Sequence, residues 1–198
     1  MRFIRLAGTV SLFVAVAIFS GCGAINAQNA GTTYKPANAT PDADGNALML
    51  KGYDVVSYFV DNKDAMGNAV FRSSYQGITF QFTSAEHKAL FDKDPTRYLP
   101  EFGGYCANGI VYGIPWGGDG DTWKMIGGKL YIFGGHGSKD AFLLDEAGNL
   151  ALAKKYWSAE VQGSNSIAQR TKRLVFKVPH YKSGEELAKA VAAAKVKR

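Results

Sequence analysis

Cysteine is scarce in this chain of 198 residues, which contains two. Cys22 follows an N-terminal segment typical of a signal peptide, so Cys106 is the one cysteine left for the folded part of the chain. A disulfide framework needs pairs of cysteines, and an all-cysteine zinc cage needs four thiolates. A single mature chain therefore has neither.

Several motifs of known enzymes are also missing. The chain has no Gly-x-Ser-x-Gly elbow, no phosphate-binding loop and no His pair of a zinc protease. Its formal net charge is +6, but the basic residues are scattered and become denser only at the C-terminus. Nucleic-acid-binding proteins gather their positive charge into a patch or stripe. We therefore expect a protein that is not an enzyme and has no nucleic-acid partner.

The N-terminus has the pattern of an export signal. Arg2 and Arg5 precede a largely apolar run from Leu6 to Phe19. This run is shorter than the ~20 residues of a membrane-spanning helix and fits the apolar region of a signal peptide. We expect residues 1–21 to be that signal peptide.

The signal ends in Ser20-Gly21-Cys22, which resembles the lipobox of bacterial lipoproteins. The resemblance implies that Cys22 carries lipid, becomes the mature N-terminus and attaches the protein to the membrane. Simple cleavage after Ala27 and an uncleaved anchor are the alternatives. All three place the chain in the cell envelope on the periplasmic side, lipid-anchored or secreted.

The remaining chain divides by composition. Residues 22–47 are rich in small and polar residues and predict a flexible tether. Residues 48–162 hold the apolar and aromatic segments of a folded domain. Residues 163–198 form a C-terminal extension, in which the alternation of 174–178 predicts a strand and the pattern from Ser183 to Glu186 predicts a capped helix.

Turn signals predict two hairpins within the domain. Gln76-Gly77 separates the strand-like residues 70–75 and 78–82, and Gly127-Gly128 separates 122–126 and 129–133. Residues 48–59 and 110–116 also have an extended character.

Helix signals lie between and after these hairpins. Thr83 and Glu86 form a capping box for a first helix, and Asp94 with Pro95 begins a second short one. Ser138 is expected to cap a helix that Gly148 breaks, and residues 150–161 are expected to be helical. Together the elements predict an α+β domain of antiparallel hairpins and short helices.

These segments resemble the YHS-domain family, specifically its secreted and lipoprotein branch in bacteria. The likeness rests on LKGYDVVSYF at residues 50–59, on Phe82-Thr83-Ser84 with later Phe91, Pro95 and Tyr98, and on Gly103-Gly104-Tyr105-Cys106-Ala107. It covers about residues 48–157. Metal-handling members of the family carry cysteines where this chain has Ser57, Thr83 and His87, so a soft-metal thiolate site is not expected at these positions.

Three residues remain candidates for chemistry. Cys106 is either a ligand or reactive thiol beside Tyr105, or a small buried residue at a crowded glycine corner. His87 is either a core histidine or a metal ligand, and His136 lies between glycines in a loop. His87, Cys106 and His136 together form a nitrogen and sulfur set that suits copper or zinc. Tyr105, Cys106 and His136 are the candidates for contacting a small ligand.

Three functions follow from these candidates. The first is a non-enzymatic binding or accessory domain of the cell envelope that holds a metal ion or a small molecule near Tyr105 and Cys106. The second is a structural module for protein interaction without a ligand, whose protein partner the sequence does not identify. The third is a thiol-dependent enzyme that uses Cys106.

Overall fold

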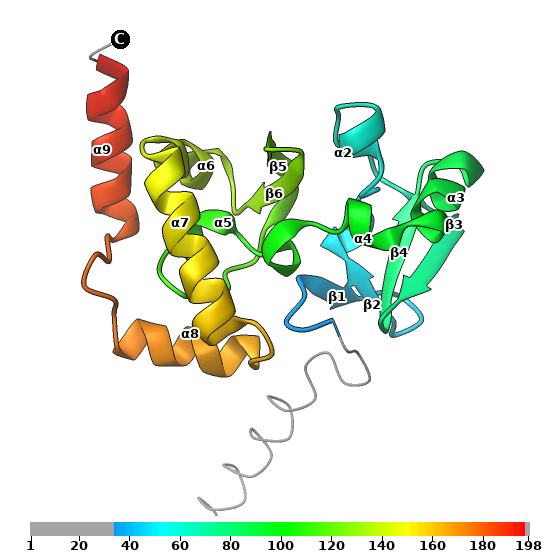
Figure 1. Cartoon of the computed structure of the whole chain (residues 1–198), viewed down its shortest axis with the longest axis horizontal. Helices are drawn as coiled ribbons and strands as arrows, with labels where there is room; N and C mark the ends of the chain where they lie inside the picture. Colours follow the sequence, from blue (N-terminus) through cyan, green and yellow to red (C-terminus); the bar gives the residue numbers. More distant parts are fainter. Residues whose placement is uncertain (1–33, 197–198) are drawn as a thin grey trace, which may run out of the picture.

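The computed structural model describes residues 34–196 of the chain. They form an α+β fold, as the sequence predicted, with two small sheets and short helices (Figure 1). Cys22, residues 1–21 and the lipidation prediction lie outside the described residues. Among the described residues, every helix is too short or too polar to cross a bilayer.

The larger sheet has four strands in the order β1-β2-β4-β3. The strands are β1 (Ala39–Pro41), β2 (Ala47–Met49), β3 (Asn68–Tyr75) and β4 (Ile78–Phe82). The predicted hairpin of β3 and β4 is confirmed. Its second strand alternates as the sequence indicated, because Ile78, Phe80 and Phe82 are buried and the residues between them are partly exposed. The pairing of β2 with β4 is parallel, which the sequence did not indicate.

The second sheet is the predicted glycine-turn hairpin of β5 (Asp119–Ile126) and β6 (Lys129–Phe133). Successive side chains of a strand point to opposite faces. Leu130 and Ile132 of β6 therefore join the core beneath the larger sheet. Tyr131 and Phe133 join a second core with α5, α6 and α7. This strand thus connects the two halves of the molecule.

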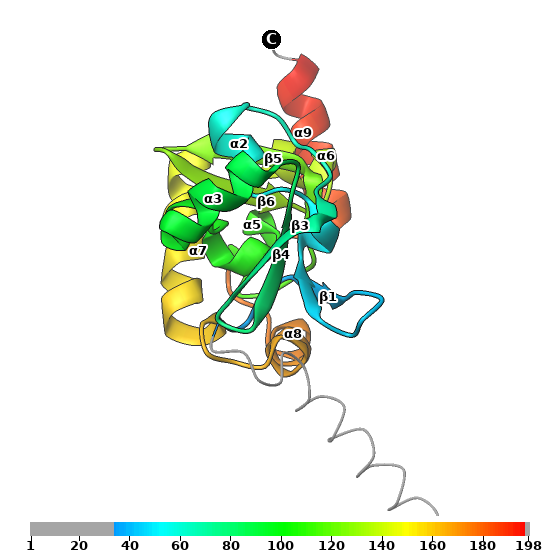
Figure 2. The same cartoon turned by 90° about the vertical axis from the view of Figure 1, so that its right-hand side faces the viewer.

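Within residues 34–196, eight helices and three single-turn segments connect and cover the sheets. Figures 1 and 2 show their arrangement. The described helices are α2 (Ser57–Val60), α3 (Ala85–Lys93), α4 (Pro95–Tyr98), α5 (Ala107–Ile110), α6 (His136–Leu143), α7 (Glu146–Tyr156), α8 (Ser166–Val175) and α9 (Gly184–Val196). The short segments are η1 (Leu50–Gly52), η2 (Glu101–Gly104) and η3 (Trp157–Val161). In both views α8 lies at the bottom and α9 runs up to the C-terminus.

Side-chain caps begin several of these helices. Asp94 caps α4 and Ser183 forms the predicted box with Glu186. The predicted cap of α3 was one residue off, because Ser84 accepts the N–H of His87 while the Thr83 hydroxyl bonds Asp54. The helix predicted to end at Gly148 is instead two helices, and the second runs through that glycine.

The glycine corner at η2 requires glycine for a steric reason. Gly103 has a φ of 60°, and a Cβ built there would lie 2.3 Å from the backbone oxygen of Pro36. Only glycine allows this approach. The corner thereby allows residues 36–38 to pack directly against η2.

Residues 34–47 differ from the predicted flexible tether. Ala37 is buried, and the side-chain amide of Asn38 donates to the carbonyl oxygens of Gly104 and Gly118 at 3.0 and 2.8 Å. The chain then pairs as β1 and β2. These contacts place the end of the predicted tether in the folded unit.

The C-terminal extension also packs onto the domain, and its predicted strand was wrong. Residues 174–175 end α8, whose N-cap is Asn165. Gln169 of this helix donates to the carbonyl oxygen of Gly113, and Arg173 pairs with Glu160. Residues 110–116 are likewise not extended, since they close α5 with tight turns.

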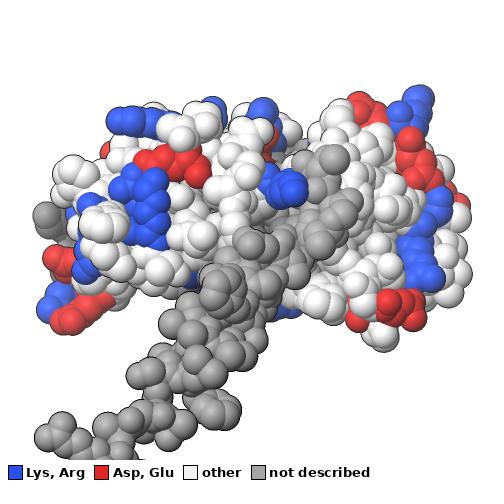
Figure 3. Space-filling model, turned by 90° about the horizontal axis from the view of Figure 1, so that it is seen from below, with Lys and Arg blue, Asp and Glu red and all other residues white. Residues whose placement is uncertain are grey.

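Charge is spread over the lower face of the molecule. Lys and Arg side chains occur at both ends of this face, next to Asp and Glu side chains (Figure 3). Lys172 and Arg173 of α8 share one carboxylate, that of Glu160.

Candidate functional site

A cavity of about 770 Å³ lies between the start of α5, the start of α6 and one face of α9. Its size is within the range of ~300–1,000 Å³ that is usual for small-molecule sites. Short segments that are far apart in sequence form its polar end and its apolar wall. The lining includes Cys106, Asn108, Tyr112, Trp116, His136 and Ser138.

Cys106 lies at the polar end and is 4% exposed. Its backbone N–H donates to the carbonyl oxygen of Trp116 at 2.9 Å, which fixes the residue at the start of α5. Its Sγ lies 3.2 Å from the Oγ of Ser138 at the start of α6. The thiol is therefore free of disulfide, buried in the wall and in contact with a hydroxyl.

The N-terminus of α6 faces the same cavity. Its N-cap is Gly135, which has a φ of 105° and no side chain to accept a hydrogen bond. Ser138 and Lys139 donate their N–H groups to the carbonyl oxygen of Gly135. The N–H groups of His136 and Gly137 have no hydrogen-bond partner among residues 34–196. The positive end of the helix dipole thus lies at the cavity.

Asn108 is the unusual polar residue of this site. It is 7% exposed and lines the cavity, yet its side-chain amide makes no hydrogen bond within the described part of the chain. Other buried polar side chains, such as Asp54, Ser57 and Gln169, are hydrogen-bonded. The amide is not among the fully buried polar atoms that lack a partner, so it reaches the open space of the cavity and is free to pair with a ligand there.

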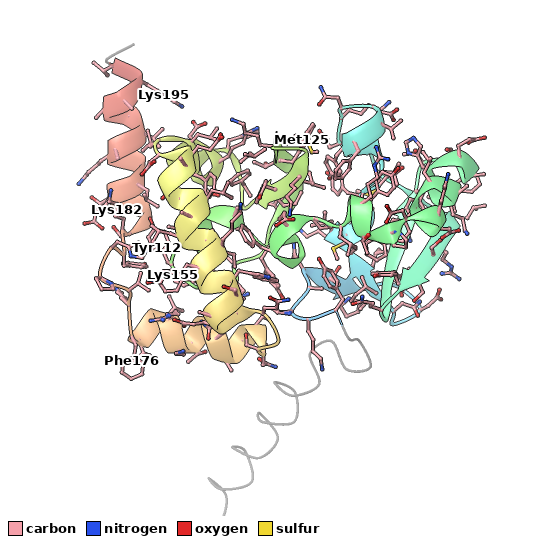
Figure 4. All side chains as sticks on the ribbon, in the orientation of Figure 1. Tyr112, Met125, Lys155, Phe176, Lys182 and Lys195 are labelled. Atoms are coloured by element: carbon pink, nitrogen blue, oxygen red, sulfur yellow. The ribbon has the colours of Figure 1, made fainter. Side chains whose placement is uncertain are left out.

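The opposite wall is apolar and aromatic. Tyr112, Ile114 and Trp116 contribute from the segment after α5, and Leu187 and Val191 contribute from α9. Trp116 is 40% exposed, and the guanidinium of Arg170 lies 4.8 Å from the centroid of its ring. Figure 4 shows Tyr112 on the side of α9 that faces α7. This wall suits an apolar or aromatic ligand body.

Helix α9 covers one side of the cavity without burying any of its own residues. Lys195 lies near the C-terminal end of α9 (Figure 4). It forms an ion pair of 2.7 Å with Asp140 of α6. The hydrogen bond from Lys195 lowers the pKa of Asp140 below its ordinary value. Lys182, just before α9, lies at the rim. The cover is therefore held by partly buried contacts and one surface ion pair.

The structure brings together two of the four predicted site residues. Cys106 and His136 line the same cavity. Tyr105 does not line it, because its hydroxyl points into the protein and donates to the carbonyl oxygen of Ala37 at 3.0 Å. Burial raises the pKa of this tyrosine. Tyr105 is therefore not a contact for a ligand of this cavity.

The structure does not bring together the predicted metal set of His87, Cys106 and His136. His87 does not line the cavity. No group of three His, Cys, Asp or Glu side chains in residues 34–196 is placed to hold a metal ion. The copper or zinc site that combined these residues is therefore not formed.

His87 instead belongs to a buried network centred on Asp54. The Nδ1 of His87 lies 2.7 Å from Oδ2 of Asp54, which is fully buried. The same carboxylate accepts the N–H and the hydroxyl of Thr83 and the N–H of Val56. The network joins α3 to the segment before α2 and gives His87 a structural role.

Sequence reasoning missed Asn108 and the covering face of α9, and it wrongly placed Ser138 at the N-cap position that Gly135 holds. Asn108 follows the Gly-Gly-Tyr-Cys motif by two residues, so it was close to the predicted site, but no local pattern marks an unpaired amide. The GGHGS sequence at 134–138 has the glycines of an uncapped helix start. These glycines are a sequence signal that could have identified the open helix start at the cavity.

Comparisons of the chain with protein-family models, with curated proteins and with solved structures find no match. The resemblance to YHS domains therefore rests on the sequence motifs alone.

Proposed function

We propose that this protein is a non-enzymatic YHS-type binding domain of the cell envelope, which holds a small ligand in the cavity beside Cys106. The observation that carries the proposal is the cavity itself, which joins Cys106, His136 and the unpaired amide of Asn108 to an aromatic wall. A small organic ligand is favoured over a metal ion because the described residues supply no set of three metal ligands there.

Two apolar dyes test the site, the neutral phenylnaphthylamine and the anionic anilinonaphthalene sulfonate. Ala192 and Ala193 are both exposed on α9, but only Ala192 lines the cavity. We expect saturable binding of at least one dye, weakened about tenfold or more by Ala192→Trp and unchanged by Ala193→Trp. No saturable binding of either dye, or equal effects of the two variants, contradicts the proposal.

A thiol-dependent enzyme is the second candidate, because Cys106 and His136 line one cavity and the Sγ of Cys106 contacts Ser138. The thiol pairs with a hydroxyl rather than with an imidazole, so the usual thiol and base pair is not formed in this geometry. Covalent turnover of a thiol-reactive ester, lost in Cys106→Ser and retained in Ser138→Ala, would favour this candidate over simple binding.

The envelope location is part of the proposal and is tested separately. Cys22 is the lipidated residue in this account, and the signal pattern of residues 1–21 supports it. We expect the protein in the membrane fraction and Cys22→Ser in the soluble periplasmic fraction. A wild-type protein that is itself soluble in the periplasm would instead support cleavage after Ala27.

A further inference from the structure

We infer that the ligand of this cavity is a small organic acid, with an apolar body and an anionic group at one end; this inference rests on the proposed function. The cavity has a polar end and an apolar wall, and the two differ in chemistry.

The polar end presents hydrogen-bond donors. The N–H groups of His136 and Gly137 have no partner among the described residues, and they begin a helix of eight residues, α6. Such groups, together with the helix dipole, attract anions. The hydroxyl of Ser138 lies in the same turn and lines the cavity. A cation would meet the positive end of the dipole here.

Asn108 is the independent observation that a ligand belongs at this end. Its residue is more than nine-tenths buried, its amide lines the cavity and it has no hydrogen bond within residues 34–196. Asn108 comes from the segment of α5, while the donors come from α6. The side-chain N–H₂ of Asn108 can donate to an anionic oxygen that the helix start also binds.

The charges around the cavity agree with an anion. Lys182 and Lys195 line it, and Asp140 is the one acidic residue that does so. Asp140 is paired with Lys195 at 2.7 Å, so its negative charge is already compensated. The summed charge of the lining side chains is therefore positive rather than negative.

The apolar wall defines the other part of the ligand. Tyr112 and Trp116 offer aromatic surfaces, and Leu187 and Val191 offer aliphatic ones. A cavity of about 770 Å³ accommodates a molecule of one or two rings or a comparable chain. The geometry thus favours an aromatic or aliphatic acid over a sugar or an inorganic ion.

The two dyes of the binding test separate this inference from the proposed function, because they share their aromatic rings and differ in the sulfonate. We expect anilinonaphthalene sulfonate to bind about tenfold more tightly than phenylnaphthylamine, and Ala192→Trp to weaken both. Equal affinities that both fall in Ala192→Trp would overturn the anion and leave the cavity as a site. Absence of cavity binding for both dyes would overturn the proposed function itself.

Two variants locate the anionic group. Asn108→Leu keeps the branched shape of the side chain and removes the amide, so we expect it to abolish most of the difference in affinity between the two dyes. Lys182 lies at the exposed rim of the cavity, so Lys182→Gln provides a second test if Asn108→Leu does not fold. Lys189 is exposed on α9 and does not line the cavity, so Lys189→Gln is the control. We expect Lys182→Gln to weaken the anionic dye about threefold and Lys189→Gln to have no effect. An anionic preference that survives Asn108→Leu and Lys182→Gln unchanged overturns the inference.

Discussion

The Sγ of Cys106 lies 3.2 Å from the Oγ of Ser138, although 32 residues separate them in the chain. This contact joins the start of α5 to the start of α6 and forms the polar end of the cavity. The Gly-Gly-Tyr-Cys corner and the Gly-Gly-His-Gly-Ser loop, which are separate motifs in the sequence, are therefore two parts of one site.

Asp54→Ala should be strongly destabilising. The variant removes a fully buried carboxylate that bonds His87, Thr83 and the backbone of Val56. We expect a loss of about 3–5 kcal/mol in the free energy of unfolding, measured by urea denaturation. The reason is that the groups bonded to Asp54 would lose their shared buried partner.

Asp44→Ala is the control for this prediction. Its carboxylate is exposed and pairs with Arg72 at 3.2 Å, so its loss should cost less than about 1 kcal/mol. Similar losses for the two variants would contradict the role given to the Asp54 network. Dye affinity should be unchanged in any Asp54→Ala protein that remains folded, since Asp54 does not line the cavity.

Asn38→Ala tests whether residues 34–47 belong to the folded unit. The substitution leaves the buried carbonyl oxygens of Gly104 and Gly118 without this donor. We expect a loss of about 1–3 kcal/mol in the free energy of unfolding. Asn46→Ala, which removes an exposed bond to Asp42, should have a much smaller effect. A neutral Asn38→Ala would show that this segment behaves as a tether.

Stability should decrease at alkaline pH because buried tyrosines resist ionisation. Burial, with a smaller contribution from Glu101, raises the pKa of Tyr131 to about 12. The folded state thus keeps a proton that the unfolded chain releases near pH 10. The resulting stability is present below about pH 10 and is lost as the pH rises towards the folded pKa.

Tyr131→Phe should make this loss less steep between about pH 10 and 12. Denaturant unfolding at several pH values measures the slope for both proteins. Identical slopes would show that Tyr131 does not contribute. Burial also raises the pKa of Tyr58 and of Tyr105, so part of the pH dependence of stability should remain in the variant.

Asp140→Asn should loosen the covering helix α9. The substitution weakens the ion pair with Lys195, while α9 buries none of its own residues. We expect faster hydrogen exchange in α9 and faster dye release. Glu185→Gln, which removes an exposed pair with Lys189 inside α9, is the control. Equal exchange in the two variants would show that the pair between α6 and α9 does not hold the cover.

The pH dependence of the same contact has a defined sign. The pKa of Asp140 is lowered by the hydrogen bond from Lys195, so the pair is intact at neutral pH. Its contribution is present above the ordinary value of about 4 and is lost as the pH falls through the lowered pKa. The protection of α9 against hydrogen exchange, relative to the intrinsic exchange rate at each pH, should therefore fall in acid.

The sequence predicted the local parts of this fold well. The hairpins of β3 with β4 and of β5 with β6 have clear turn residues and alternation, and they form as predicted. The parallel pairing of Leu48 with Thr79 joins distant residues and has no local signal. The strand predicted at 174–178 failed because Asn165 caps a helix there and Gln169 and Arg173 anchor it.

The candidate site was also predicted only in part, because local motifs identify single residues but not the contacts between distant segments. Cys106 and His136 were both identified as polar residues near glycines, and they share a cavity. His87 was grouped with them by residue type, although its imidazole bonds Asp54. The unpaired amide of Asn108 and the cover of α9 depend on packing between distant segments, which a single sequence does not specify.

The alkylation rate of Cys106 tests the central claim most directly, because its thiol lies in the wall of the cavity and is the one free cysteine in the described part of the chain. In protein that carries Cys22→Ser, we expect a saturating dye to slow alkylation of Cys106 about tenfold or more, with half-protection at the dissociation constant of the dye. Ala192→Trp should shift this protection to higher dye concentration, and Ala193→Trp should not. Saturable dye binding with an unchanged alkylation rate would contradict the account, because the dye would then occupy another place on the protein.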